Sequence, residues 1–174
     1  SAIYPSLRDR VVFVSGGASG IGAAIVEQFC LQGAKVSFVD IDADAAASLA
    51  DDIAARDLPR PRFLPCDLKD VEALQYTIGQ VITADGPITA LINNAANDER
   101  HTIDDVTPAY FDDRIAVNLR HQFFATQAVH GPMAEAGGGA IVNIGSVTWL
   151  IGQGGMPCYS ASKAAVAGLT RSLA

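Results

Sequence analysis

The fold of this 174-residue chain is decided by one stretch near its start, Val11-Val12-Phe13-Val14-Ser15-Gly16-Gly17-Ala18-Ser19-Gly20-Ile21-Gly22. Its first four residues are β-branched or aromatic and end at a glycine turn, which is typical of a buried parallel strand. Apolar residues then recur at helical spacing until Gly33. Glycines spaced four and then two apart depart from the GxGxxG fingerprint. Their place between a strand and a helix still allows a tight turn and a close approach of the backbone to a phosphate. The stretch predicts a turn that binds a dinucleotide phosphate at a helix N-terminus.

Strands and helices alternate along the rest of the chain. Further strands are predicted at 35–40, 62–66, 88–92 and 140–144, and helices at 43–55, 71–84, 107 to about 133, and from about 157 onward. This alternation predicts an α/β fold, a Rossmann-type doubly wound parallel sheet in three α/β/α layers. No linker or repeat interrupts it, so we expect residues 1–174 to form a single dinucleotide-binding domain.

The end of the chain carries no helix stop signal. An all-parallel sheet ending at the fifth strand would also leave a long apolar edge, which proteins avoid. We therefore expect that C-terminal strands are missing from this chain.

Composition and charge narrow the partners. Twelve Lys and Arg against nineteen Asp and Glu give a net charge of −7, which argues against nucleic acid. The sequence shows no secretion signal and no apolar run of about 20 residues, so we expect a cytoplasmic protein without a membrane partner. The three widely spaced cysteines form no CxxC pair, and the histidines lack ligand-like spacing, which predicts buried thiols and no metal site.

An acid closes the second predicted strand. Asp40 lies twenty residues after Gly20, where a carboxylate can accept hydrogen bonds from both hydroxyls of an adenosine ribose. The same charge would repel a 2′-phosphate, and Ser19 supplies no cation to compensate. The cofactor is therefore predicted to be NAD, with NADP less favoured. The alternative is that Asp40 caps the helix that begins after Asp42.

Tyr159 and Lys163 form the candidate catalytic pair. A free tyrosine has a pKa of about 10 and is a poor base at neutral pH. Residues four apart share a helix face, so the Lys163 ammonium can lie near the phenol and favour its ionised form. Ser146 lies just beyond the fifth strand, at the sheet edge where ligands bind. These residues predict a nicotinamide oxidoreductase.

As a set, these motifs resemble the short-chain dehydrogenase/reductase family, in its compact branch. The resemblance extends from Leu7 to Ala174 and rests on SGGASGIG (15–22), Asp40, CDL (66–68), NNAA (93–96), Asn118, Ser146 and YSASK (159–163). One departure is Ala96, which stands where the family usually has glycine. The resemblance also implies a homodimer or homotetramer.

The resemblance implies a role for each matched residue. Tyr159 would be the general acid/base, Ser146 would hydrogen-bond the reacting oxygen, Lys163 would bind the nicotinamide ribose, and Asn118 would hold a water in a proton relay. The residues expected to bind the cofactor are Gly16, Ser19, Gly20, Ile21, Gly22, Asp40, Asp67, Leu68, Asn94, Ala95, Tyr159 and Lys163.

The segment between Ser146 and Tyr159 should border a small-molecule substrate, with Trp149 and Gln153 as further candidate contacts. Trp149 fits a packing role equally well. The polar stretches 97–101 and 118–121, with 145–149, are similar to bacterial NAD-dependent aldose (D-xylose-type) 1-dehydrogenases.

We therefore expect an enzyme that transfers hydride between nicotinamide and an alcohol or carbonyl substrate, a sugar in this interpretation. The alternatives are a 3-oxoacyl thioester reductase or other carbonyl reductase, and a non-catalytic dinucleotide-binding regulator. Ser19 and Asp40 argue against the reductase, which resembles NADP-dependent enzymes with a basic residue near the turn. A regulator would have no reason to keep Ser146, Tyr159 and Lys163 together.

Overall fold

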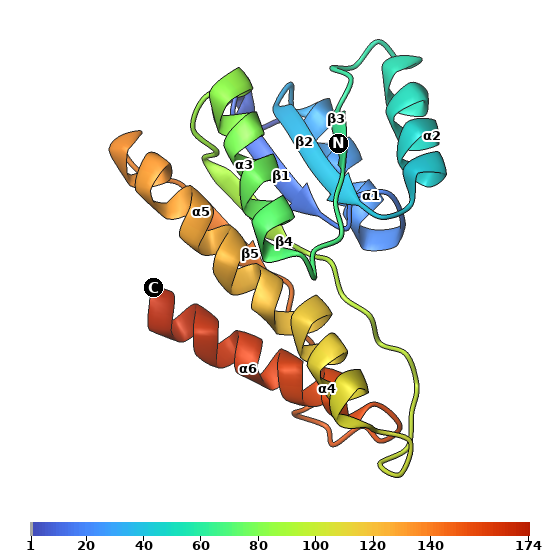
Figure 1. The fold of residues 1–174 in the computed structure, drawn as a ribbon. Helices are drawn as coiled ribbons and strands as arrows, with labels where there is room; N and C mark the ends of the chain where they lie inside the picture. Colours follow the sequence, from blue (N-terminus) through green and yellow to red (C-terminus); the bar gives the residue numbers. More distant parts are fainter. Residues whose placement is uncertain (1) are drawn as a thin grey trace.

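A computed structural model describes residues 2–174 and contains a five-stranded parallel sheet (Figure 1). The strands are β1 (Val11–Ser15), β2 (Lys35–Asp40), β3 (Arg62–Pro65), β4 (Ala90–Asn93) and β5 (Ala140–Asn143). Their order is β3-β2-β1-β4-β5, so the chain builds outward from β1 in both directions. The predicted Rossmann-type sheet is confirmed, and the change of direction between β1 and β4 opens a crevice where such folds bind ligands.

The helical segments have bounds close to those predicted. They are η1 (Pro5–Leu7), α1 (Gly20–Leu31), α2 (Ala43–Ala54), α3 (Val71–Asp85), α4 (Pro108–Ile115), η2 (Ala116–Arg120), α5 (His121–Glu135) and α6 (Pro157–Leu173). The side chains of Asp42 and Asp70 cap α2 and α3 by accepting from Ala45 N and Ala73 N. None of the helices within residues 2–174 has both the length and the apolar character needed to cross a membrane.

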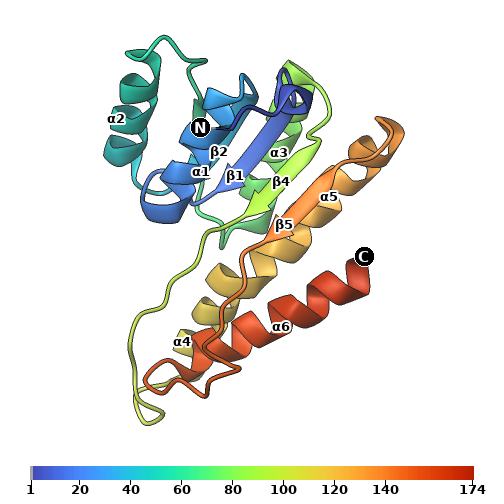
Figure 2. The ribbon, with the colours of Figure 1, turned by 180° about the vertical axis from the view of Figure 1, so that it is seen from behind.

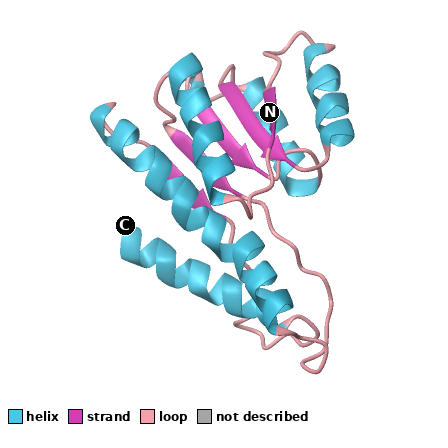
Figure 3. Ribbon diagram, viewed as in Figure 1, coloured by secondary structure: helices cyan, strands magenta, loops and turns pink. Residues whose placement is uncertain are grey.

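The sheet carries a hydrophobic core on each face. Figure 3 shows the helices that flank the sheet. Successive strand residues point to opposite faces, so Val12 and Val14 pack with α1 and α2, whereas Val11 and Phe13 pack with α3 and α5. Figures 1 and 2 show α1 and α3 on opposite sides of the sheet. The predicted three-layer arrangement is therefore present.

The structure differs in detail from the single helix predicted from residue 107 to about 133. α4, η2 and α5 follow one another without a break, but η2 is a five-residue π-helical segment that contains Asn118. Such segments are rare and occur often at functional sites. Nothing in the apolar spacing indicated this segment.

Two loops extend away from the sheet and meet beside the first turns of α4 and α6 (Figures 1 and 2). One follows β4 and the other follows β5. His101 N of the first loop donates to Gly155 O of the second at 2.9 Å. The segment that leads into α6 is therefore held in place by a loop that is distant in the sequence.

Candidate active site

The glycine turn is anchored to the ends of two neighbouring strands. Gly16 N and Gly17 N both donate to Val39 O of β2, at 2.9 and 3.2 Å. On the other side, Asn94 Nδ2 donates to Ser15 O at 3.1 Å and to Gly16 O at 2.9 Å. The side chain of Asn94 therefore holds the turn in shape from the end of β4.

Two glycines of the turn have opposite surroundings. A Cβ added at Gly22 would lie against Gly16 O and 2.7 Å from Asn94 Nδ2, so no side chain fits there. Gly20 has a φ of +53°, which favours glycine, and a Cβ at this position would meet nothing within 4 Å. The N-cap of α1 is Ser19, whose hydroxyl makes no capping bond within residues 2–174. Open space beside the first amides of α1 suits a phosphate group.

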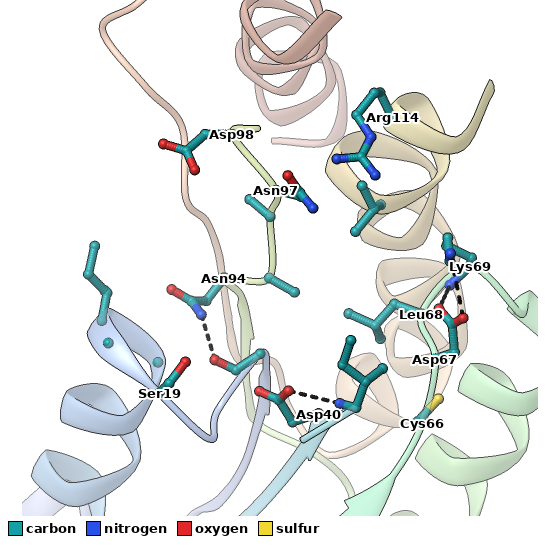
Figure 4. Close-up of a pocket in the computed structure, with 18 of the residues that line it drawn as sticks. Ser19, Asp40, Cys66, Asp67, Leu68, Lys69, Asn94, Asn97, Asp98 and Arg114 are labelled. Carbon is teal, nitrogen blue, oxygen red and sulfur yellow. Dashed lines mark hydrogen bonds and ion pairs between the residues drawn. The ribbon is translucent and has the colours of Figure 1, made fainter. Parts of the chain in front are cut away.

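A pocket of about 600 Å³ lies at this end of the sheet (Figure 4). Its lining includes ten of the residues predicted to bind the cofactor: Gly16, Ser19, Gly20, Ile21, Gly22, Asp40, Asp67, Leu68, Asn94 and Ala95. Pockets of this size bind small ligands and cofactors. The structure thus brings these residues together, and the role of each stays a prediction.

Asp40 is bonded to the glycine turn. Its Oδ2 accepts from Ala18 N at 2.9 Å, and its Oδ1 accepts from Ile41 N at 2.8 Å and from Asp42 N at 3.2 Å. The alternative role as cap of α2 is wrong, because Asp42 is the N-cap. A carboxylate offers about four acceptor positions, so Asp40 retains capacity for a ligand hydroxyl in the pocket.

The opposite wall contains charged residues that the sequence analysis missed. Arg114 is ion-paired with Asp113 and, at 3.3 Å, with Glu99, while Lys69 Nζ lies 3.1 Å from Asp113 Oδ1. The hydrogen bond from Arg114 holds the pKa of Asp113 below its usual value, and the bond to Asp113 raises the pKa of Lys69. Arg114 lies four residues before Asn118, but the π-helical segment that begins between them breaks the α-helical spacing, so no sequence pattern indicated Arg114. The pocket also includes Ile41, Cys66, Ala96, Asn97, Asp98 and Val117.

Lys163 lies beside Tyr159 and is almost fully buried. Its ammonium donates to Ile144 O, just beyond β5, at 2.6 Å and lies 5.6 Å from the centre of the Tyr159 ring. Burial lowers the pKa of Lys163 from 10.5 to about 8. The lysine is 1% exposed, whereas Tyr159 is partly buried. The predicted pair is therefore adjacent, at the carboxyl end of the sheet.

The other two predicted catalytic residues have their own partners. Asn118 is buried, and its side-chain amide accepts from Asn97 N at 2.8 Å and donates to Asn97 O at 3.1 Å. Each end of this amide makes one bond and keeps a second position for a relay water, while the Asn118 main-chain carbonyl accepts from Gln122 Nε2 at 3.3 Å. Ser146 Oγ bonds to Thr148 Oγ1 at 3.1 Å and accepts from Thr148 N.

The predicted substrate residues lie outside the pocket described above. Its described lining contains neither Ser146 nor Tyr159, and neither Trp149 nor Gln153. Trp149 is 42% exposed in the loop after β5, followed by Leu150 and Ile151, which are 65% and 68% exposed. The substrate contacts stay a prediction.

Comparison with known proteins agrees with this geometry. The sequence model of a family described as short chain dehydrogenase matches residues 10–174. All 174 residues align with 68% of a Rhizobium meliloti (strain 1021) protein named "Probable galactose dehydrogenase GalD", at 45% identity. They also align with 68% of a D-xylose 1-dehydrogenase from Caulobacter vibrioides (strain NA1000 / CB15N), at 44% identity. The chain thus spans about two thirds of the length of these relatives.

Solved structures give the same result. A short chain dehydrogenase from Mycobacterium smegmatis superposes with a TM-score of 0.91 at 31% identity, covering 98% of this chain and 72% of its own. A metagenomic short-chain oxidoreductase in complex with NADP gives a TM-score of 0.92 at 30% identity, covering 97% of this chain and 76% of its own.

Proposed function

The chain belongs to the short-chain dehydrogenase family, whose members bind a nicotinamide dinucleotide, and we propose that it is an NAD-dependent dehydrogenase of an aldose. The observation that carries the proposal is the adjacent Lys163 and Tyr159 on α6, at the sheet end where the glycine turn and the pocket lie. The sugar is supported by the names of the relatives at 45% and 44% identity.

In the proposed oxidation, the substrate loses a hydride from carbon and a proton from its anomeric hydroxyl, leaving a lactone. Bound NAD would supply the acceptor for this hydride. Tyr159 takes the proton, and the Lys163 ammonium favours the ionised phenol by its charge. Ser146 donates a hydrogen bond to the substrate oxygen in exchange for its present bond to Thr148. The proton then leaves toward a water held by Asn118.

The choice of NAD over NADP is proposed on the charges around the pocket. Asp40 places a carboxylate at the end of β2, where it would repel a 2′-phosphate. The cations of the pocket, Lys69 and Arg114, are both paired with Asp113 and so are partly neutralised. This distribution of charge favours NAD, whose adenosine ribose carries a free 2′-hydroxyl, over NADP.

We also propose that the protein acts on its small-molecule substrate as a homodimer or homotetramer in the cytoplasm. Partly exposed Phe111, Phe123 and Leu173 on α4, α5 and α6 support self-association. The cytoplasmic location is supported by the three cysteines, which are buried and unpaired in the described part of the chain.

The test is Tyr159→Phe, assayed in the full chain with NAD and a panel of pentoses, hexoses and 3-oxoacyl thioesters. We expect turnover to fall by about 10²- to 10⁴-fold, since the variant cannot exchange the proton, while NAD binding by calorimetry is nearly unchanged. Tyr76→Phe, on the exposed side of α3, is the matched control and should keep full turnover. Undiminished turnover of Tyr159→Phe would remove this residue from the mechanism, and activity on thioesters alone would refute the aldose proposal.

A further inference from the structure

His101 joins three segments of the molecule from the loop after β4. Its side chain is buried, with 8% of the residue exposed. Nδ1 lies 2.9 Å from Glu99 O and 2.9 Å from Tyr110 Oη, whereas Nε2 lies 3.3 Å from Cys158 N. The backbone amide of His101 also donates to Gly155 O.

These partners determine the protonation of the ring. A backbone N–H can only donate, so Nε2 must accept from Cys158 N. Glu99 O can only accept, so the proton lies on Nδ1, where the Tyr110 hydroxyl oxygen is a second acceptor. The surroundings therefore select the neutral ring in one tautomer.

The bond to Cys158 lies at a helix end that lacks a cap of its own. The first amides of a helix have no partner within the helix, and a polar N-cap side chain usually satisfies one of them. The N-cap of α6 is Met156, which makes no such bond within residues 2–174, and Pro157 has no amide proton. His101 thus supplies from a distant loop the acceptor that the start of α6 does not provide.

The same histidine connects this helix to the wall of the dinucleotide pocket. Tyr110 bonds to His101, and the Arg114 guanidinium lies over the Tyr110 ring at 5.1 Å from its centre. Arg114 lines the pocket, as does Asn97 in the loop that carries His101 (Figure 4). Contacts therefore run without a gap from the pocket through Tyr110 and His101 to the residue before Tyr159.

We propose that His101 is a positioning residue for Tyr159: it caps the first turn of α6 from the loop that borders the dinucleotide pocket, and so holds the tyrosine in place. The inference rests on the proposed function, because it gives Tyr159 the catalytic proton transfer. The exact position of Tyr159 matters, since a shift of about 1 Å at a reacting group can lower turnover by about 10²-fold.

Three substitutions in the full chain separate capping from packing. His101→Gln places a carbonyl near the Nε2 position and keeps an acceptor for Cys158 N. His101→Asn reaches only the Nδ1 position and keeps the donor to Glu99 O but loses the cap. His101→Phe keeps an aromatic ring and loses every side-chain hydrogen bond. Each variant is measured for kcat, for KM of NAD and of the sugar, for Tm, and for hydrogen exchange of the Cys158 amide.

We expect His101→Asn and His101→Phe to lower kcat by about 10- to 10²-fold, with KM for NAD nearly unchanged, and to exchange the Cys158 amide faster. His101→Gln should restore slow exchange and most of kcat. If Gln and Asn behave alike, or if exchange accelerates without loss of kcat, the histidine only packs the loop and the inference is wrong.

Tyr159→Phe, measured alongside, distinguishes two failures. If Tyr159→Phe lowers turnover and none of the His101 variants does, only the positioning role fails. If Tyr159→Phe leaves turnover unchanged, the proposed function itself fails. Should His101→Phe not fold, the Gln and Asn pair still decides between the two roles.

Discussion

The two ends of the candidate site are held by different kinds of contact. The glycine turn is tied to β2 by backbone bonds from Gly16 and Gly17 to Val39 O, and to β4 by Asn94. The start of α6 is tied by His101, whose ring accepts from Cys158 N, 57 positions away, and whose backbone amide donates to Gly155 O. The phosphate end is thus part of the sheet itself, whereas the tyrosine end depends on a loop reaching across to a helix.

Burial follows the same division. The residues of β1 that lead into the glycine turn are buried on both faces of the sheet. The loop that leads from β5 to α6 instead exposes Val147, Leu150 and Ile151. Regions with few buried contacts open at low free energy, and sites that admit a substrate are drawn from them. We therefore expect damage at the glycine turn to affect stability first and damage near Tyr159 to affect turnover first.

The largest expected effect is that of Gly22→Ala on stability. The added methyl group would overlap Gly16 O and Asn94 Nδ2, and moving this backbone should lower the free energy of unfolding by about 3 kcal/mol or more. Gly20→Ala is the matched control, because the added Cβ would meet no atom within 4 Å. Its only cost is the left-handed backbone conformation, which should lower the free energy of unfolding by about 1–2 kcal/mol. Urea unfolding measures both. Equal losses would contradict the close approach of Gly22 to the turn.

At the tyrosine end, Lys163→Met should lower turnover by orders of magnitude without a comparable loss of stability. The buried lysine has a pKa of about 8 against 10.5 when unfolded, so below pH 8 its charge destabilises the fold by about 3 kcal/mol. Met removes this penalty and also the bond to Ile144 O. The variant should therefore be at least nearly as stable as the parent at pH 7.

The sign of the pH dependence gives a second readout for Lys163. Between pH 8 and pH 10.5 the unfolded parent binds more protons than the folded one, so this group makes the parent more stable as pH rises. The stability of Lys163→Met relative to the parent should fall across that window. Exposed Lys35→Met is the control and should show no such trend. A relative stability that rises with pH would refute the buried charge.

The smallest expected effect is a change of cofactor preference in Asp40→Asn. Removing one negative charge near the ribose should narrow the ratio of kcat/KM for NAD over NADP by about tenfold, which corresponds to about 1.4 kcal/mol. Asp42→Asn is the matched control, since Asp42 caps α2 and should leave the ratio unchanged. An unchanged ratio in Asp40→Asn would separate this acid from cofactor choice and leave it only its bonds to the glycine turn.

Most predictions that depended on local spacing agree with the structure. β1, the glycine turn and α1 follow from a β-branched run, glycines and helical periodicity, all within 21 residues. Tyr159 and Lys163 are four apart on α6, so their proximity follows from helix geometry. The π-helical turn at Asn118 was missed, because apolar spacing does not record one extra residue in a turn.

By itself, the sequence determined the parallel α/β sheet, the phosphate turn and the lysine beside the tyrosine, because each depends on residues within one strand, turn or helix. Only the tertiary structure decided that Arg114 and Asp113 form a pocket wall, that Asn118 is hydrogen-bonded to Asn97, and that His101 caps α6. The physical reason is that these contacts join segments that lie far apart in the chain, and no spacing pattern in the sequence relates such segments. They exist only once the sheet has brought the β4 loop, α4 and α6 to the same edge.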